Sequence, residues 1–256
     1  MGANVAAYRK QGFLLLEGLF GSGELSAATA WLDGVESFRG PQVGVTDGGE
    51  VQSVYGVHEL EPRVLDLVRS EKLRPVLTEL LGGSFYLYQS QLHLKPASSS
   101  TLDWHQDFRA YHDYDGLPRP DGAIVGIFLD PISEDMAPVR VIPRSHRFGL
   151  LEAELATPVP QRGPTGVAAA GDREPKMAYR IPEPAMRTLF QEDSIVPLVG
   201  AAGTVFICDM CLVHSSDLNH TGRRRGILYT NVARVGVTPS KLDRPPFVVA
   251  RDYDEL

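Results

Sequence analysis

The stretch Leu102-Asp103-Trp104-His105-Gln106-Asp107-Phe108 decides how the rest of the chain is interpreted. We predict a strand over residues 103–109, and side chains two positions apart on a strand point to the same face. His105 and Asp107 would then converge on one point, as an imidazole and a carboxylate that bind one metal ion. Two histidines and one carboxylate on one side of an ion, with its other positions open, form the ligand set of non-haem Fe(II) oxygenases. A third ligand must come from elsewhere in the chain.

The best candidate for the third ligand is His214, which follows the apolar run Thr204-Val205-Phe206-Ile207-Cys208. A short apolar run of this kind is consistent with a buried strand. The chain has seven histidines, so a chance His-x-Asp pattern is not rare, and His220 is a rival ligand. His214 is preferred because the predicted strand leads directly into it.

The order of the predicted elements indicates a mainly β fold with helices at its N-terminal end. We predict helices at 4–11 and 24–35, a hairpin over 41–57, and two further helices, one with Pro62 in its first turn and one that stops at Gly82-Gly83. Short strands follow at 84–96, 103–109, 123–130, 138–142, 194–198, 203–208, 225–233 and 246–250. A double-stranded β-helix (a cupin-like jelly roll) buttressed by the N-terminal helices would bring the early and late strands together.

Length, composition and charge exclude several classes of protein. The 256 residues, 43% of them hydrophobic, suit a single domain over 1–256, with a lid or flexible insertion at 156–182 where Pro, Gly and Ala are frequent. The formal charge of −7 argues against a nucleic-acid partner. No apolar stretch approaches the ~20 residues that cross a bilayer, and the N-terminus lacks a basic and apolar leader. We therefore expect a cytoplasmic protein without a membrane partner and leave its oligomeric state open.

The only two cysteines, Cys208 and Cys211, have the Cys-x-x-Cys spacing of a redox pair or of half a zinc site. Positions three apart on a strand point to opposite faces, and no second such pair exists to complete a zinc site. We interpret both as small strand residues that remain reduced.

The cluster from His214 to Arg225 contains groups that an oxygenase dependent on 2-oxoglutarate needs. The planar fork of an Arg pairs with a carboxylate through two parallel hydrogen bonds, which suits the distal carboxylate of that cosubstrate. Arg225 stands at the start of the predicted strand 225–233, and Ser216 and Thr221 offer hydroxyl groups in the preceding turn. Arg223 and Arg224 are interpreted as a solvated basic turn.

The strand predicted over 84–96 has one face that turns polar from Gln89 onward, through Gln91, His93 and Lys95. Two interpretations of this face remain open. It is either solvated or it lines a ligand cavity inside a barrel.

Taken together, these motifs resemble the phytanoyl-CoA dioxygenase superfamily of Fe(II)/2-oxoglutarate oxygenases. The resemblance rests on Trp104-His105-Gln106-Asp107, on the late pattern His-x-Ser-x-x-Asn-x-Thr that begins at His214, and on the Arg eleven residues after that His. It extends from about residue 8 to the end of the chain. Further likeness, to ectoine hydroxylases and, at the C-terminal end, to bacterial hydroxylases of free leucine, is carried by Gln89-Ser90, Lys95-Pro96, Asp115-Gly116-Leu117-Pro118, Ser145-His146 and Phe247-Val248-Val249-Ala250-Arg251-Asp252.

The resemblance implies Fe(II), 2-oxoglutarate and O2 as cofactor and cosubstrates. It implies iron ligation by His105, Asp107 and His214. Contacts to 2-oxoglutarate are implied for Arg225, Ser216, Thr221, His93 and Leu102. Contacts to the substrate are implied for Gln89, Tyr111 and Arg251.

Three of these positions depart from the ectoine enzymes. His93 stands where they carry Asn, Leu102 where they carry an aromatic residue, and Tyr111 where they carry Trp. These departures count against ectoine itself as the substrate.

The implied reaction is hydroxylation of an unactivated C–H bond of a small molecule, for which we expect a free amino acid or an amino-acid derivative. The cosubstrate would leave as succinate and CO2. Related halogenases have Gly or Ala at the position of Asp107, so the carboxylate favours hydroxylation. Two alternatives remain, a jelly-roll protein that binds a small molecule and a metalloenzyme that does not use 2-oxoglutarate, and Arg225 would be dispensable in both.

Overall fold

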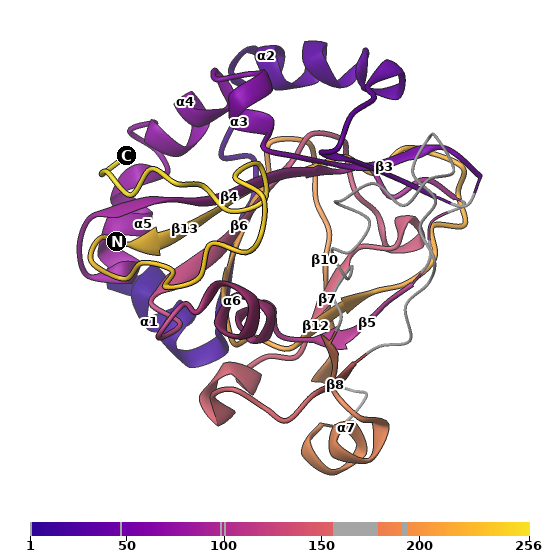
Figure 1. Cartoon of the computed structure of the whole chain (residues 1–256). Helices are drawn as coiled ribbons and strands as arrows, with labels where there is room; N and C mark the ends of the chain where they lie inside the picture. The colour runs from indigo at the N-terminus through magenta and orange to yellow at the C-terminus, as the bar shows by residue number, and fades with distance from the viewer. Residues whose placement is uncertain (1, 47, 98, 100, 156–178, 191–193) are drawn as a thin grey trace.

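Two antiparallel sheets face each other and form the predicted double-stranded β-helix (Figure 1). The computed structural model describes residues 2–46, 48–97, 99, 101–155, 179–190 and 194–256. The larger sheet has the strand order β1 (Phe13–Leu16), β11 (Val205–Asp209), β6 (Gly122–Phe128), β13 (Ile227–Arg234), β4 (Phe85–His93), β3 (Val51–Tyr55) and β2 (Val43–Val45). The smaller sheet has the order β10 (Val196–Leu198), β7 (Val139–Val141), β12 (His214–Ser216) and β5 (Leu102–His105). A separate pair joins β8 (Glu154–Leu155) to β9 (Tyr179–Arg180).

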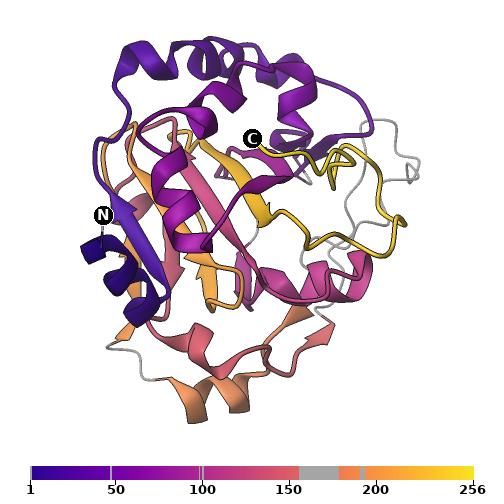
Figure 2. The same ribbon diagram turned by 90° about the vertical axis from the view of Figure 1, so that its left-hand side faces the viewer.

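The N-terminal helices cover the larger sheet (Figures 1 and 2). They are α1 (Gly2–Gln11), α2 (Ser22–Leu32), α3 (Val57–Leu60), α4 (Val64–Arg69) and α5 (Arg74–Leu81), with a 3-10 turn over Val35–Ser37. Two further helices, α6 (Asp107–Asp115) and α7 (Glu183–Leu189), and the 3-10 turns Glu134–Met136 and Ser145–Phe148 come later in the chain. As predicted, α5 stops at Gly82, whose φ of +68° is a left-handed conformation that glycine adopts without strain.

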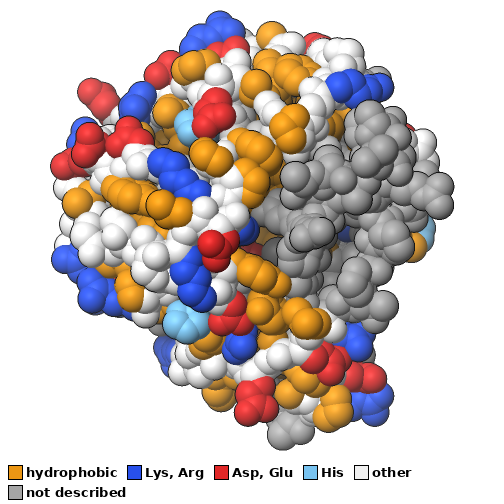
Figure 3. Space-filling view, viewed as in Figure 1, with side chains coloured by type: hydrophobic (Ala, Val, Ile, Leu, Met, Phe, Trp, Pro, Cys, Tyr) orange, Lys and Arg blue, Asp and Glu red, His pale blue; other side chains and the backbone are white. Residues whose placement is uncertain are grey.

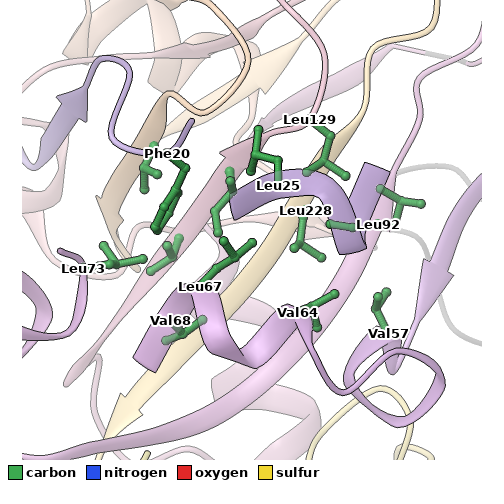
Figure 4. Close-up of a cluster of buried hydrophobic side chains, with 14 of the residues drawn as sticks. Phe20, Leu25, Val57, Val64, Leu67, Val68, Leu73, Leu92, Leu129 and Leu228 are labelled. Atoms are coloured by element: carbon green, nitrogen blue, oxygen red, sulfur yellow. The ribbon is translucent and has the colours of Figure 1, made fainter. Parts of the chain in front are cut away.

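The main core lies between these helices and the outer face of the larger sheet (Figure 4). Leu92 of β4 and Leu228 of β13 belong to one buried cluster with Leu25 of α2 and Leu67 of α4. Burying each such side chain stabilises the fold by about 1.5–3 kcal/mol. The packing of the helices therefore stabilises the larger sheet, whose inner face is turned toward the smaller sheet.

The inner face of the larger sheet carries a second apolar cluster that includes Phe128, Phe206 and Ile227. A Cβ atom added to Gly126 would lie 2.1 Å from the ring of Phe206, so the glycine makes room for that ring on the neighbouring strand. Because side chains alternate along a strand, Tyr229 packs inward with this cluster while Leu228 packs outward.

The strand predicted over 103–109 is wrong in its second half. β5 ends at His105, and Asp107 is the first residue of α6. The chain turns at Gln106, whose Nε2 donates hydrogen bonds to the carbonyl oxygens of Gly149 (2.8 Å) and Cys211 (2.6 Å). His105 and Asp107 are therefore not two residues of one strand face, although both side chains point to the same place.

The strand predicted over 246–250 is also wrong, because these residues form a tight turn. The N–H groups of Val248 and Val249 both donate to the carbonyl of Pro245. The run is apolar because it is buried against Tyr86, Tyr88 and their neighbours, and burial alone does not require an extended chain.

Two other expectations need adjustment. Three helices rather than two follow the hairpin, and Pro62 precedes α4 instead of lying in its first turn. The lid or insertion predicted over 156–182 lies outside the described residues from 156 to 178, and its last part begins with β9. Among the described parts of the chain, none of the helices combines the length and the apolar character needed to cross a membrane.

Candidate active site

Two adjacent strands of the smaller sheet place His105 and His214 side by side. His105 is the last residue of β5 and His214 the first of β12, and the two are direct partners in the antiparallel register. Directly opposed side chains of an antiparallel pair lie on the same face. The ring centroids are 4.1 Å apart.

Asp107 meets both imidazoles from the first turn of α6. Its Oδ1 lies 3.4 Å from Nε2 of His105 and 3.7 Å from Nε2 of His214. One ligand atom from each of the three residues lies within 4.8 Å of the others. The side chains of His105, His214 and Asp107 are 1%, 12% and 13% exposed, so the cluster is largely buried.

Backbone carbonyl groups fix the orientation of both imidazoles. Nδ1 of His105 lies 2.6 Å from the carbonyl oxygen of Asp103, and Nδ1 of His214 lies 2.9 Å from that of Leu212. A carbonyl only accepts, so Nδ1 carries the proton in each ring and the lone pair of Nε2 faces Asp107. Bonds of this kind to Nδ1 are the usual support for a metal-binding histidine.

The protonation states also suit a metal ion. Burial, together with the neighbouring His105, lowers the pKa of His214 to about 4, so this imidazole is neutral at pH 7. Burial alone would raise the pKa of Asp107, but the neighbouring His214 and His105 outweigh it and lower the pKa. Neutral imidazole and ionised carboxylate are the forms that bind a divalent cation. These residues therefore fit Fe(II).

Arg225 is a buried cation whose partners are incomplete. Its side chain is almost inaccessible to solvent, and Nη1 donates to the carbonyl oxygen of Ala137 at 2.6 Å. Among the described residues, its Nε is buried without a hydrogen-bond partner, and no carboxylate is among the groups that shift the pKa of its guanidinium. Burial lowers the pKa of Arg225 from its ordinary value, although Tyr229 acts in the opposite direction. A guanidinium stays charged in proteins, so this position favours an anionic ligand.

Ser216 and Leu102 lie opposite each other at the far ends of β12 and β5. Nζ of Lys95 donates to Oγ of Ser216 at 3.1 Å. The motif Lys95-Pro96 was noticed in the sequence, but nothing in its spacing indicated that the ammonium group reaches Ser216.

Thr221 closes the turn between β12 and β13. Its Oγ1 donates to Oδ1 of Asn219 at 2.8 Å and accepts the N–H of Arg223 at 3.1 Å. Asn219 in turn donates to the carbonyl oxygens of Lys95 (2.9 Å) and Arg223 (2.7 Å). The hydroxyl of Thr221 therefore holds the loop that carries Arg225.

The polar face of β4 points toward the site. The ring of His93 packs edge-on against Tyr229, with centroids 5.4 Å apart. Gln89, Tyr111 and Asn231 form a buried hydrogen-bonded group, and the Tyr111 hydroxyl also lies 3.3 Å from Oδ2 of Asp107. Asn231 was missed in the sequence, where only its inward register on the strand 225–233 could have indicated it.

Arg251 bonds to the backbone of the C-terminal segment. Its Nη2 donates to the carbonyl oxygens of Leu242 (3.2 Å) and Arg244. The guanidinium of Arg244 lies over the ring of Tyr111 (5.9 Å) and pairs with the buried carboxylate of Asp115. Arg251 thus reaches the neighbourhood of Tyr111 through Arg244.

Other sequence candidates are not part of the three-residue cluster. Among the described residues, the group that can hold a metal contains His214 and does not contain the exposed His220. Cys208 and Cys211 are free thiols, as predicted, and burial raises the pKa of both. Cys208 lies on β11, but Cys211 lies in the turn after that strand and is not a strand residue. Where the described residues form the face shown in Figure 3, acidic and basic side chains are interspersed rather than gathered into a basic patch.

Comparisons with known proteins converge on one family. A family model described as phytanoyl-CoA dioxygenase matches residues 8–227, which include every residue from His105 to Arg225. The chain is 31% identical over 250 residues to the L-proline trans-4-hydroxylase of Streptomyces griseoviridis, which covers 96% of this chain and 91% of that protein. It is 30% identical over 224 residues to the ectoine dioxygenase of Bordetella bronchiseptica, which covers 84% and 69%. The crystal structure of EctD from S. alaskensis with 2-oxoglutarate and 5-hydroxyectoine superposes with a TM-score of 0.78 at 25% identity, over 98% of this chain and 84% of that one.

Proposed function

Because the chain belongs to the phytanoyl-CoA dioxygenase family and is an iron- and 2-oxoglutarate-dependent dioxygenase, we propose that it hydroxylates a free amino acid. We assign iron ligation to His105, Asp107 and His214, and the distal carboxylate of 2-oxoglutarate to Arg225. The single observation that carries this assignment is the cluster of three ligand atoms within 4.8 Å of one another. The Nε of Arg225, which has no hydrogen-bond partner among the described residues, supports the assignment of 2-oxoglutarate to this side chain.

When bound, the iron with 2-oxoglutarate and O2 supplies the chemistry that converts a C–H bond to C–OH while 2-oxoglutarate is converted to succinate and CO2. The protein binds, orients and excludes water. Arg225 holds one end of 2-oxoglutarate with help from the hydroxyl of Ser216, and Leu102 forms an apolar wall beside it. Thr221 acts by holding the loop, and His93 borders the same space through its contact with Tyr229.

The substrate class is inferred from the relatives and from the residues near Asp107. The relatives named above act on L-proline and on ectoine, which are a free amino acid and a small amino-acid derivative. We propose Gln89 and Tyr111 as substrate contacts, with Arg251 supporting this side of the pocket. A single domain over 1–256, a cytoplasmic location and the absence of a nucleic-acid or membrane partner are parts of the same proposal.

A panel of free amino acids, scored by succinate release, tests this function. We expect L-proline or another small amino acid to raise succinate release at least about tenfold above the rate without substrate, with a product heavier by one oxygen in mass spectrometry. Ectoine serves as the comparison and should give less product. If no amino acid stimulates succinate release while ectoine does, the proposed substrate class is wrong.

A further inference from the structure

The orientation of the Asn231 side chain is dictated by the backbone. The N–H of Val125 on β6 lies 3.2 Å from the Asn231 amide, and a backbone N–H only donates. The Asn231 atom that faces it must therefore be the oxygen, Oδ1. The oxygen and nitrogen of this amide are therefore distinguished by their partners.

The Asn231 nitrogen consequently faces the other two members of the group. Nδ2 lies 3.0 Å from the hydroxyl of Tyr111 and 3.4 Å from Gln89. Since Nδ2 only donates, both neighbours must accept from it. Gln89 therefore turns Oε1 toward Asn231, and its Nε2 points the other way.

The Tyr111 hydroxyl has one proton left to donate after it accepts from Asn231. Oδ2 of Asp107 lies 3.3 Å away, and Oε1 of Gln89 lies at the same distance. The carboxylate is the stronger acceptor because it is ionised. A bond to Oδ2 leaves Oδ1, the oxygen nearer to both imidazoles, as the one that faces the metal position.

The group is too deeply buried to rearrange at no cost. Asn231 is 0% exposed and Gln89 and Tyr111 are each 4% exposed. Inside such a site each lost hydrogen bond leaves a desolvated polar atom, so a satisfied network holds one arrangement. Yet Nε2 of Gln89 has no hydrogen-bond partner among the described residues, which leaves two N–H donors available to a ligand.

We propose that Asn231 is a positioning residue that presents Gln89 to the substrate as a donor and turns Oδ1 of Asp107 toward the metal. The substrate atom that meets Gln89 is then a hydrogen-bond acceptor, and in a free amino acid the carboxylate fills this role. The inference rests on the proposed function for the identity of the substrate. Its claim about Asp107 stands on metal binding alone.

The first test measures Fe(II) affinity without oxygen in Asn231→Leu, Tyr111→Phe and the double variant. Loss of a residue that orients a metal ligand typically lowers metal affinity by about 10–100-fold. We expect the Fe(II) affinity of each single variant to fall by at least about tenfold. The affinity of the double variant should fall little further, because Asn231 and Tyr111 act through the same hydrogen bond to Asp107. Thr230→Val is the matched control, since its buried hydroxyl lies on the opposite face of β13 and has no partner among the described residues.

The second test concerns the polarity of Gln89. Gln89→Glu keeps the shape but removes both N–H donors, so KM for the amino acid should rise about tenfold or more while kcat and Fe(II) affinity change little. In the same variant, kcat/KM for the carboxamide of that amino acid should rise by at least about tenfold relative to kcat/KM for the acid. Asn231→Leu should also raise KM for the acid, because the Gln89 side chain loses the hydrogen bond that fixes its orientation.

The outcomes separate this inference from the proposed function. Unchanged Fe(II) affinity and KM in folded Asn231→Leu, with wild-type activity intact, would overturn the positioning role alone. Wild-type protein that binds no Fe(II) would overturn both. Should Asn231→Leu not fold, Asn231→Ser retains a small polar side chain and is expected to show the same two losses.

Discussion

Asp107→Ala is expected to abolish hydroxylation. Removal of the supporting partners of metal ligands lowers activity about 10–100-fold, so removal of a ligand itself should lower succinate release and product by at least about 100-fold. The loss follows because the only carboxylate of the cluster disappears, and two neutral imidazoles hold a divalent cation more weakly. The measurement is product formed per enzyme under saturating Fe(II), 2-oxoglutarate and substrate.

Asp113→Ala is the control for Asp107→Ala. Asp113 also lies on α6 and pairs with Arg109 at 2.8 Å, partly exposed, so its removal should change stability by less than about 1 kcal/mol. Its activity should stay within about twofold of wild type. An Asp107→Ala protein that is folded and keeps a tenth or more of wild-type turnover would exclude Asp107 as a ligand.

Arg225→Ala is expected to lose the cosubstrate while it keeps the metal. Truncating one side of a buried, hydrogen-bonded charge pair costs about 2–5 kcal/mol of binding, so Kd for 2-oxoglutarate should rise by roughly 100-fold. Fe(II) affinity measured without cosubstrate should change little. Arg225→Lys keeps the charge but not the planar fork, so its Kd for 2-oxoglutarate should lie between those of wild type and Arg225→Ala.

The effect of replacing Arg225 on the stability of the protein distinguishes a binding role from a structural one. Arg225 is a buried cation without a carboxylate partner in the described part of the chain, and such a charge destabilises the fold. Arg225→Met should therefore be at least as stable as wild type without 2-oxoglutarate. Arg224→Ala is the control, because Arg224 pairs with Asp130 at the surface and should leave Kd for 2-oxoglutarate within about twofold. If Arg225→Ala bound 2-oxoglutarate as tightly as wild type, Arg225 would not be the residue that holds the distal carboxylate.

Much of the fold and of the cluster could be predicted from residue spacing. His214 is the direct strand partner of His105, as the choice of third ligand requires. The apolar run that favoured it does not carry it, because that run is β11 of the larger sheet and ends at Asp209, whereas His214 begins β12 of the smaller sheet. His105 and Asp107 do lie together, but not as alternate residues of one strand, because β5 ends at His105 and Asp107 begins α6. A helix that starts at Asp107 also turns its first side chain back toward the preceding strand, and local sequence did not separate the two cases.

The remaining parts depend on contacts between distant segments, which spacing cannot show. Asn231 matters because of Val125, Gln89 and Tyr111, which come from three other elements. A strand is predicted over 246–250, yet these residues form a turn that is held by hydrogen bonds to the carbonyl oxygen of Pro245. A buried turn and a buried strand are equally apolar in sequence, so only the tertiary packing decides which of the two forms.

The central claim, that one site holds both Fe(II) and 2-oxoglutarate, is tested most directly by mixing the two with the protein in the absence of oxygen. A keto acid chelated to Fe(II) gives a weak visible charge-transfer band. We predict that this band appears on addition of 2-oxoglutarate, saturates at one equivalent per chain, and is absent when succinate replaces it. Folded protein that shows no band at saturating Fe(II) and 2-oxoglutarate would contradict the account.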